Sequence, residues 1–167
     1  EAAKDVTVQT NLSEARLLIG DTKLYKAFES AMQAAMQPQA FFEAKLKEQE
    51  QRHAKFNDTS YNLEPNIKES PGGLRDLQNV LWIANSMGFG DCWSALARHG
   101  LITPLEARQI RRHERHLQTL RVRLHYLAKR REDRLLFDFQ NDLAKELGYE
   151  SSKRRRASEQ LMNGFYR

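Results

Sequence analysis

The residue types that bind anions and approach a ligand closely are concentrated in residues 61–76, which we call the glycine segment. Its candidate binding residues are Asn66, Lys68, Gly72, Gly73, Arg75 and Asp76. Glycine has no Cβ, so the backbone can approach a neighbour closely. Free N–H groups where a helix begins bind anions. The same residues also suit a loop whose polar side chains hold its own backbone, and local chemistry supports the two interpretations equally.

Other chemistry is sparse. Cys92 is the single cysteine, so neither an internal disulfide nor a multi-cysteine zinc site can form, and a reducing cytoplasm fits. His113 and His116 share a helix face, but without a third ligand we interpret them as ordinary core or surface histidines. The chain has a net charge of +5, and its basic residues cluster in two stretches, residues 108–134 and 153–156. We interpret them as solvated helix faces, compatible with an acidic partner, and expect no nucleic acid partner.

The elements that must position the glycine segment are predicted to be almost all helices. Proline, glycine and capping residues delimit helices over about 22–36, 41–57, 74–87, 91–98, 103–129, 135–147 and from about 151 to the end. Thr103-Pro104 with Glu106 forms the clearest start signal, a capping box with proline in the first helical position. The helix it opens carries an apolar seam typical of a bundle, formed by Ile110, His113, Leu117, Leu120, Leu124 and Leu127.

The N-terminal segment has a different pattern. Val6 to Thr10 alternates and is rich in β-branched residues, which predicts a short strand. No apolar run is long enough to cross a membrane, so we expect no membrane partner. The sequence starts without methionine at Glu1, and we expect a fragment of a longer protein. The fold class is therefore mainly α, a helical bundle with one short N-terminal strand.

The glycine segment also carries a family resemblance. Residues 61–78, YNLEPNIKESPGGLRDLQ, resemble the signature of bacterial PII uridylyltransferases almost residue for residue. Ser70 stands where that family usually has glycine, and we expect it to cap the helix that follows. Residues 5–20, Asn57-Asp58-Thr59 and 134–138 are similar to the family as well. The resemblance spans most of the chain and is weakest after Gly148.

The resemblance implies a bifunctional cytoplasmic enzyme. Such an enzyme transfers UMP from UTP to a tyrosine of the PII nitrogen-signalling protein with Mg²⁺, and as a hydrolase it removes the group when glutamine, its effector, is plentiful. The transfer site of the family needs an Asp-x-Asp pair for the metal, and the hydrolase needs a His-Asp pair. This sequence contains neither an Asp-x-Asp pattern nor a His-Asp pair. We therefore expect the isolated chain to be inactive in both directions.

One catalytic candidate follows from the same resemblance. Polymerase β-like nucleotidyltransferases use a third carboxylate on a strand beside the metal-binding acids. If the chain stays extended after Val8, Glu14 would fill that place as a catalytic, metal-binding residue. A surface glutamate early in a helix is the alternative. We accordingly expect residues 1–37 to be the C-terminal edge of a nucleotidyltransferase domain, from which the strand remains, and residues 38–167 to be its associated helical domain.

Two alternative assignments stay open at this point. The first is the helical domain of a nucleotidyltransferase linked to CBS modules, whose members share a similar Gly-Gly-Leu-Arg helix start. The second is a non-catalytic bundle that docks the PII protein. In the preferred assignment, Asn66, Lys68, Gly72, Gly73, Arg75 and Asp76 bind nucleotide or substrate from the helical side of the cleft.

Overall fold

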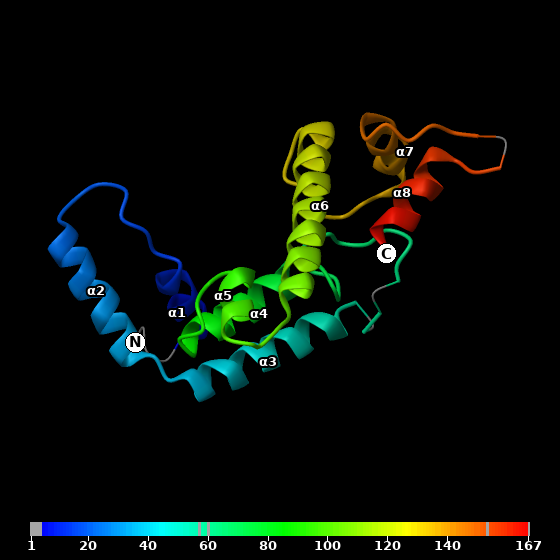
Figure 1. The fold of residues 1–167 in the computed structure, drawn as a ribbon. Helices are drawn as coiled ribbons and strands as arrows, with labels where there is room; N and C mark the ends of the chain where they lie inside the picture. Colours follow the sequence, from blue (N-terminus) through cyan, green and yellow to red (C-terminus); the bar gives the residue numbers. More distant parts are fainter. Residues whose placement is uncertain (1–4, 57, 60, 153, 167) are drawn as a thin grey trace. The chain divides into compact units, whose positions relative to one another are not determined.

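A computed structural model describes residues 5–56, 58–59, 61–152 and 154–166. Asn57 and Lys153, which belong to two of the motifs above, lie outside the described residues. Within the described ranges the chain forms eight helices and no strand, so the mainly α prediction is confirmed (Figure 1). One isolated antiparallel bridge pairs Asn66 with Arg134.

The first four helices are α1 (Val6–Ser13), α2 (Thr22–Ala35), α3 (Pro38–Ala54) and α4 (Leu74–Ser86). The last four are α5 (Trp93–Arg98), α6 (Pro104–Ala128), α7 (Phe137–Glu146) and α8 (Ala157–Phe165). None of the helices that the structure describes combines the length and the apolar character needed to span a bilayer.

The predicted N-terminal strand is wrong, because Val6 to Ser13 form helix α1. The Asp5 carboxylate accepts hydrogen bonds from the N–H groups of Thr7 and Val8, at 2.8 and 3.2 Å. The Thr10 hydroxyl donates to the Val6 carbonyl 2.6 Å away, one turn earlier. An aspartate in the N-cap position satisfies the first free N–H groups of a helix. That local bond outweighs the weak β-propensity of the four β-branched residues in Val6 to Thr10.

The other helix starts follow their capping residues. Asp21 caps α2, and the Thr103–Glu106 capping box is present at α6: the Glu106 carboxylate accepts from the Thr103 N–H at 2.7 Å. Two helices begin later than predicted, α5 at Trp93 and α8 at Ala157. Cys92, one residue after Asp91, is the N-cap of α5, and Arg156 is the N-cap of α8. Ser151 still contributes, because its hydroxyl accepts from the N–H of Ala157, the first residue of α8.

The chain divides into two packing units. Unit 1 comprises the described residues of 1–50 and 78–107, and unit 2 comprises those of 51–77 and 108–167. The boundaries fall inside α3, α4 and α6, so they do not test the predicted domain boundary at residue 37, which stays a prediction.

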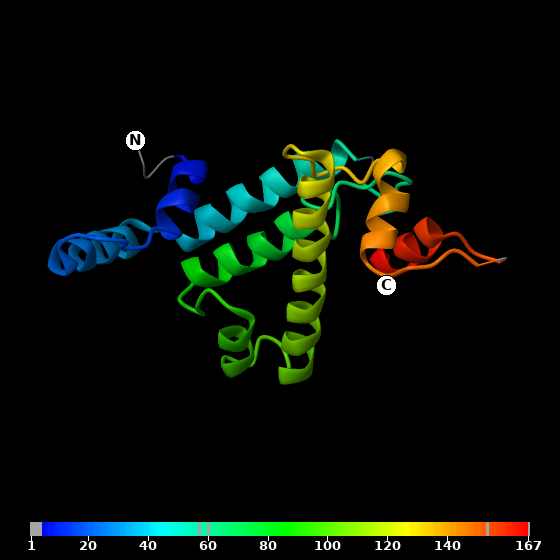
Figure 2. The ribbon, with the colours of Figure 1, turned by 90° about the horizontal axis from the view of Figure 1, so that it is seen from above.

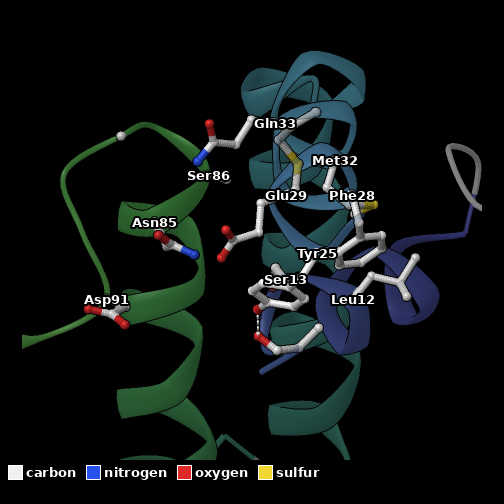
Figure 3. Close-up of a pocket in the computed structure, with 13 residues that line it drawn as sticks. Leu12, Ser13, Tyr25, Phe28, Glu29, Met32, Gln33, Asn85, Ser86 and Asp91 are labelled. Atoms are coloured by element: carbon white, nitrogen blue, oxygen red, sulfur yellow. Dashed lines mark hydrogen bonds between the residues drawn. The ribbon is translucent and has the colours of Figure 1, made fainter. Parts of the chain in front are cut away.

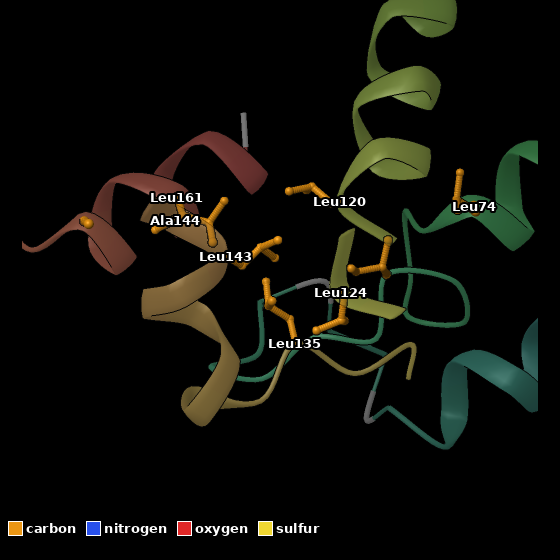
Figure 4. Packing of buried hydrophobic residues seen from close by; sticks show 9 residues of the cluster. Leu74, Leu120, Leu124, Leu135, Leu143, Ala144 and Leu161 are labelled. Atoms are coloured by element: carbon orange, nitrogen blue, oxygen red, sulfur yellow. The ribbon is translucent and has the colours of Figure 1, made fainter. Parts of the chain in front are cut away.

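Unit 2 has an aliphatic core. Leu120 and Leu124 of α6 are fully buried, and α7 packs on α8 beside them (Figures 2 and 4). The buried cluster consists of Ile67, Leu74, Leu120, Leu124, Leu135, Leu143, Ala144, Ala157 and Leu161. Ile67 and Leu74 belong to the glycine segment, so the segment is anchored in this core by two buried side chains. The predicted α6 seam is confirmed at its C-terminal half, whereas His113 is exposed.

Unit 1 is built differently. Its buried residues include Phe41, Trp82 and Trp93, together with the polar side chains of Lys45 and Asn79. Helix α2 buries none of its residues, and Leu18, Ile19 and Leu24 are largely exposed. The interior of unit 1 is therefore small and partly polar.

Candidate functional site

Asn66 forms the first turn of the glycine segment. Its side-chain oxygen accepts from the N–H groups of Lys68 and Glu69, at 3.0 and 2.8 Å. Its own N–H donates to the Ser70 hydroxyl, 2.9 Å away. Ser70 is 4% exposed, and its hydroxyl fastens this turn, so the expectation that it caps the next helix is wrong. An asparagine that bonds to the backbone two and three residues ahead shapes a turn without any ligand.

The two glycines have different reasons to be glycine. Gly72 has a φ of +78°, a left-handed conformation that costs other residues energy. A Cβ at Gly73 would lie 2.9 Å from each of three carbonyl oxygens, those of Ile67, Lys68 and Ser70. Such a separation is well inside normal contact distance. Gly73 is therefore required because the segment folds closely upon itself, and the close approach that the sequence predicted is to its own backbone.

Asp76 closes the segment from the first turn of α4. Its carboxylate accepts from the Gly72 N–H at 2.7 Å and from the Arg52 guanidinium. The His53 ring nitrogen Nε2 lies 3.0 Å from both of its oxygens. The Asp76 side chain is 17% exposed, and these partners occupy both of its oxygens. Its observed contacts join the end of α3 to the glycine segment.

Lys68 and Arg75 both lie beside Glu69. The Lys68 ammonium is 3.4 Å and the Arg75 guanidinium 3.5 Å from the same Glu69 oxygen. Arg52 approaches the other oxygen at 3.8 Å and donates to the Glu69 carbonyl at 2.9 Å. Because Arg52 also binds Asp76, three cations lie beside two carboxylates, which leaves a local surplus of one positive charge. This surplus is partly exposed, since the Lys68 and Arg75 side chains keep 17% and 28% of their surface.

A cavity of about 250 Å³ opens on the glycine segment. Asn66, Gly72 and Gly73 line it, so the structure brings these three predicted residues together; Lys68, Arg75 and Asp76 are not in its lining. Small-molecule pockets usually measure roughly 300–1,000 Å³. The cavity is therefore suited to a small group, such as one side chain or one phosphate, and too small for a whole nucleoside triphosphate.

Three side chains that were not among the predicted binding residues also line this cavity: Tyr61, His113 and Tyr166. The rings of Tyr61 and Tyr166 lie 5.1 Å apart. The Tyr166 hydroxyl donates to the Asn62 carbonyl and accepts from the Asn62 N–H at 3.0 Å. Burial raises the pKa of Tyr166 above its usual value. Only Tyr61 had a signal in the sequence, as the first residue of the family-like stretch.

Glu14 lies where α1 ends, not on a strand. Its carboxylate accepts a 2.6 Å hydrogen bond from the indole N–H of Trp82 in α4. The condition for its catalytic role, an extended chain after Val8, is therefore not met. Within the described residues no three His, Cys, Asp or Glu side chains form a group that could hold a metal ion. The metal-binding role of Glu14 stays a prediction.

A second cavity, of about 530 Å³, lies within unit 1 (Figure 3). Helices α1, α2 and α4 line it, and Tyr25, Phe28, Glu29 and Asn85 point toward it. The Tyr25 hydroxyl donates to the Ala15 carbonyl at 2.6 Å, which fixes the chain that enters α2. None of the predicted site residues lines this cavity.

Comparison with known proteins decides the family. The model of one family, GlnD PII-uridylyltransferase, matches residues 40–167, which include the whole glycine segment. The chain belongs to the GlnD PII-uridylyltransferase family. Its resemblance to this family is thus confirmed and favoured over the CBS-linked alternative.

Curated relatives in this family match from end to end. A bifunctional uridylyltransferase/uridylyl-removing enzyme of Nitrosospira multiformis is 58% identical over 100% of the chain. Enzymes of the same name from Burkholderia lata and Burkholderia orbicola are 56% and 55% identical over 99% of the chain. The chain spans 19% of the length of each of these relatives. No solved structure matches the chain.

The PII-uridylyltransferase family match also separates two parts of the chain. The family model begins at residue 40, whereas the relatives match residues 1–39 as well. Glu14 and α2 therefore lie outside the family model but inside the sequence shared with the relatives, and the glycine segment lies inside both.

Proposed function

We propose that this chain is the helical, substrate-side part of a bifunctional enzyme that transfers UMP from UTP to a tyrosine of the PII protein and also removes it. Family membership supports the proposal, as do relatives that carry both activities in their names. The observation that carries it is the glycine segment. Its family-like residues form a braced turn with a surplus of positive charge on one side and a small cavity in its surface.

The braced turn suggests a division of labour. Asn66, Gly73 and Asp76 form bonds or contacts within the segment, so their role is to hold its shape. Lys68 and Arg75 keep a partly exposed positive charge, which suits the phosphates of UTP. The bonds between residues then fix the position of two cations before the nucleotide arrives.

The chemistry of transfer and hydrolysis belongs to other parts of the full-length protein in this proposal. Among the described residues no group of three His, Cys, Asp or Glu side chains could hold a metal ion, so none offers a Mg²⁺ site of that kind. We therefore assign Mg²⁺ and the hydrolytic centre to segments outside this chain, and glutamine to a regulatory site there. A cytoplasmic location is part of the same proposal, in keeping with the single cysteine.

The test is UMP transfer to purified PII by the full-length protein carrying Lys68→Ala or Arg75→Ala. We expect the KM for UTP to rise about fivefold to tenfold, the loss of one charge-assisted contact, while the Tm stays close to that of the wild type. Lys145→Ala is the matched control, because Lys145 is exposed and pairs only with the exposed Asp142 among the described residues. Unchanged kinetics in both variants would assign the segment to structure alone.

A further inference from the structure

Helix α6 presents a basic face away from the core of unit 2. Leu117, Leu120 and Leu124 lie in the seam that faces the core. On the opposite side, exposed residues recur every three or four positions, which places them on one face of a helix. They are Arg108, Arg111, Arg112, Arg115, Thr119, Val122, Arg123 and Tyr126, and we call them the α6 outer face. Five of these eight residues are arginines.

Most of the arginines on the α6 outer face have no counter-charge within the described part of the chain. Among the residues that the structure describes, no carboxylate forms an ion pair with Arg111, Arg112 or Arg115. Arg123 has a weak partner, Glu146 at 3.9 Å, and both side chains are more than two-fifths exposed. Arg121, which lies off this face, binds Asp133 at 2.6 Å. Arg121 is thus closely paired, whereas Arg111, Arg112 and Arg115 of the outer face have no carboxylate partner among the described residues.

A groove runs along the C-terminal half of this face. It encloses about 580 Å³, and its lining includes Arg115, Val122, Arg123 and Tyr126 with Glu146 of α7. Tyr126 is 80% exposed and Val122 is 53% exposed. Tyrosine and arginine are the residue types that, with tryptophan, contribute most of the energy in protein interfaces. An exposed tyrosine one turn from Arg123, in a groove that Arg115 also lines, therefore has the composition of an interface centre.

We propose that the α6 outer face docks a carboxylate-bearing segment of the PII protein, an inference that rests on the proposed function. Unpaired arginines attract carboxylates. The exposed surfaces of Val122 and Tyr126 are buried favourably by apolar side chains of a partner. A protein segment supplies both. A nucleic acid backbone fits less well, because its phosphates would pair with the arginines but offer no apolar side chain to cover Val122. The acceptor protein thereby binds through a surface separate from the glycine segment.

The experiment compares full-length wild-type enzyme with the double variant Arg111→Glu, Arg115→Glu. We expect the KM for PII to rise about tenfold or more, because charge reversal turns attraction into repulsion at the first encounter. The KM for UTP and kcat at saturating PII stay unchanged. The effect shrinks as salt is added, since exposed charges are screened beyond roughly 8 Å at physiological ionic strength.

The control is Arg154→Glu, Arg155→Glu, which reverses two exposed arginines elsewhere in unit 2. An equal rise in KM for PII in this control would overturn the assigned surface, because net charge alone would then explain the effect. A wild-type enzyme that modifies PII, with an α6 variant that modifies it equally well, refutes the docking surface and leaves the proposed function intact. A wild-type enzyme that cannot modify PII refutes both.

Duplex DNA is the competing probe. If the wild-type enzyme binds duplex DNA at physiological salt and the α6 variant does not, while PII kinetics are unchanged, the α6 outer face is a nucleic acid surface and the proposal is wrong. We expect no such binding and a retained α-helical circular dichroism spectrum in every variant, since all four arginines are exposed.

Discussion

Unit 2 and unit 1 differ in what they bury. In unit 2 the buried residues are mainly leucines, five of which have no exposed surface. In unit 1 the buried residues include Lys45, whose ammonium lies 2.9 Å from Glu48 and 4.8 Å from the centre of the Trp82 ring system. Aliphatic burial stabilises without orientation, whereas buried polar groups stabilise only in the right geometry. The stability of unit 2 therefore depends on packing, and the stability of unit 1 depends on a few directed contacts.

The largest expected effect comes from the aliphatic core. Leu124→Ala removes a side chain with no exposed surface and should lower the free energy of unfolding by about 3 kcal/mol, the usual cost of a leucine-sized cavity. Val122→Ala, on the exposed face of the same helix, should cost less than about 0.5 kcal/mol. Urea unfolding of both variants measures the difference. Equal losses would mean that unit 2 does not depend on its leucine core.

The glycine pair gives the next effect. Gly73→Ala should cost about 2 kcal/mol, because its Cβ would lie 2.9 Å from three carbonyl oxygens that the turn holds in place. Gly72→Ala should cost only about 1 kcal/mol, since its Cβ meets nothing within 4 Å and only the positive φ is unfavourable. Thermal unfolding of both variants ranks them. A larger loss for Gly72 would show that backbone conformation outweighs crowding here.

Local signals made the helices predictable. Asp21 and the pair Thr103 and Glu106 cap α2 and α6 through bonds to residues two or three positions away, so a short stretch of sequence contains both partners. The strand predicted for Val6 to Thr10 is wrong because the Asp5 carboxylate, which starts a helix, outweighs the β-branched pattern. Both outcomes concern contacts within one turn of the chain.

The cavity on the glycine segment was not predictable in the same way. Tyr166 reaches Asn62 across more than one hundred residues, and His113 comes from another helix. The spacing of α6 placed His113 on the apolar seam, although the core ends before it. Asn66, Gly72 and Gly73 were recognisable because residues 61–78 form one continuous family-like string. His113 and Tyr166, which complete the cavity lining, are far from that string in sequence, so no local pattern contains them.

A smaller effect tests whether directed contacts also matter in unit 2. Arg121 and His125 donate to the carboxylate of Asp133. The backbone carbonyl of Asp133 accepts from the Ile67 N–H at 2.8 Å. Burial alone would raise the pKa of Asp133, but the two hydrogen bonds outweigh burial and lower it. Asp133→Asn should therefore cost about 1.5 kcal/mol at neutral pH, the value of bonds to a charged group.

The sign of the pH dependence follows from that lowered pKa. The stabilisation by Asp133 is fully present above the unfolded pKa of about 3.9 and is lost as the pH falls through the lower folded value. Unfolding between pH 5 and about 2 should show a shallower pH dependence in Asp133→Asn than in the wild type. Asp142→Asn, which changes an exposed carboxylate, is the control. Parallel curves for Asp133→Asn and wild type would contradict the assignment.

The smallest effect concerns Glu14 and Trp82 in unit 1. If Glu14 acts through its 2.6 Å bond to the Trp82 indole, Glu14→Ala and Trp82→Phe should each cost about 1 kcal/mol, and the double variant should cost less than their sum. The full-length Glu14→Ala enzyme should then keep a near-normal kcat for UMP transfer. A fall in kcat of a hundredfold or more, on the order expected for a lost catalytic group, confined to the Glu14 variants and absent in Trp82→Phe, would instead make Glu14 the third carboxylate. That result would mean that the hydrogen bond to Trp82 keeps a catalytic carboxylate in an inactive position. The Glu14 carboxylate would have to leave the indole in order to reach the metal.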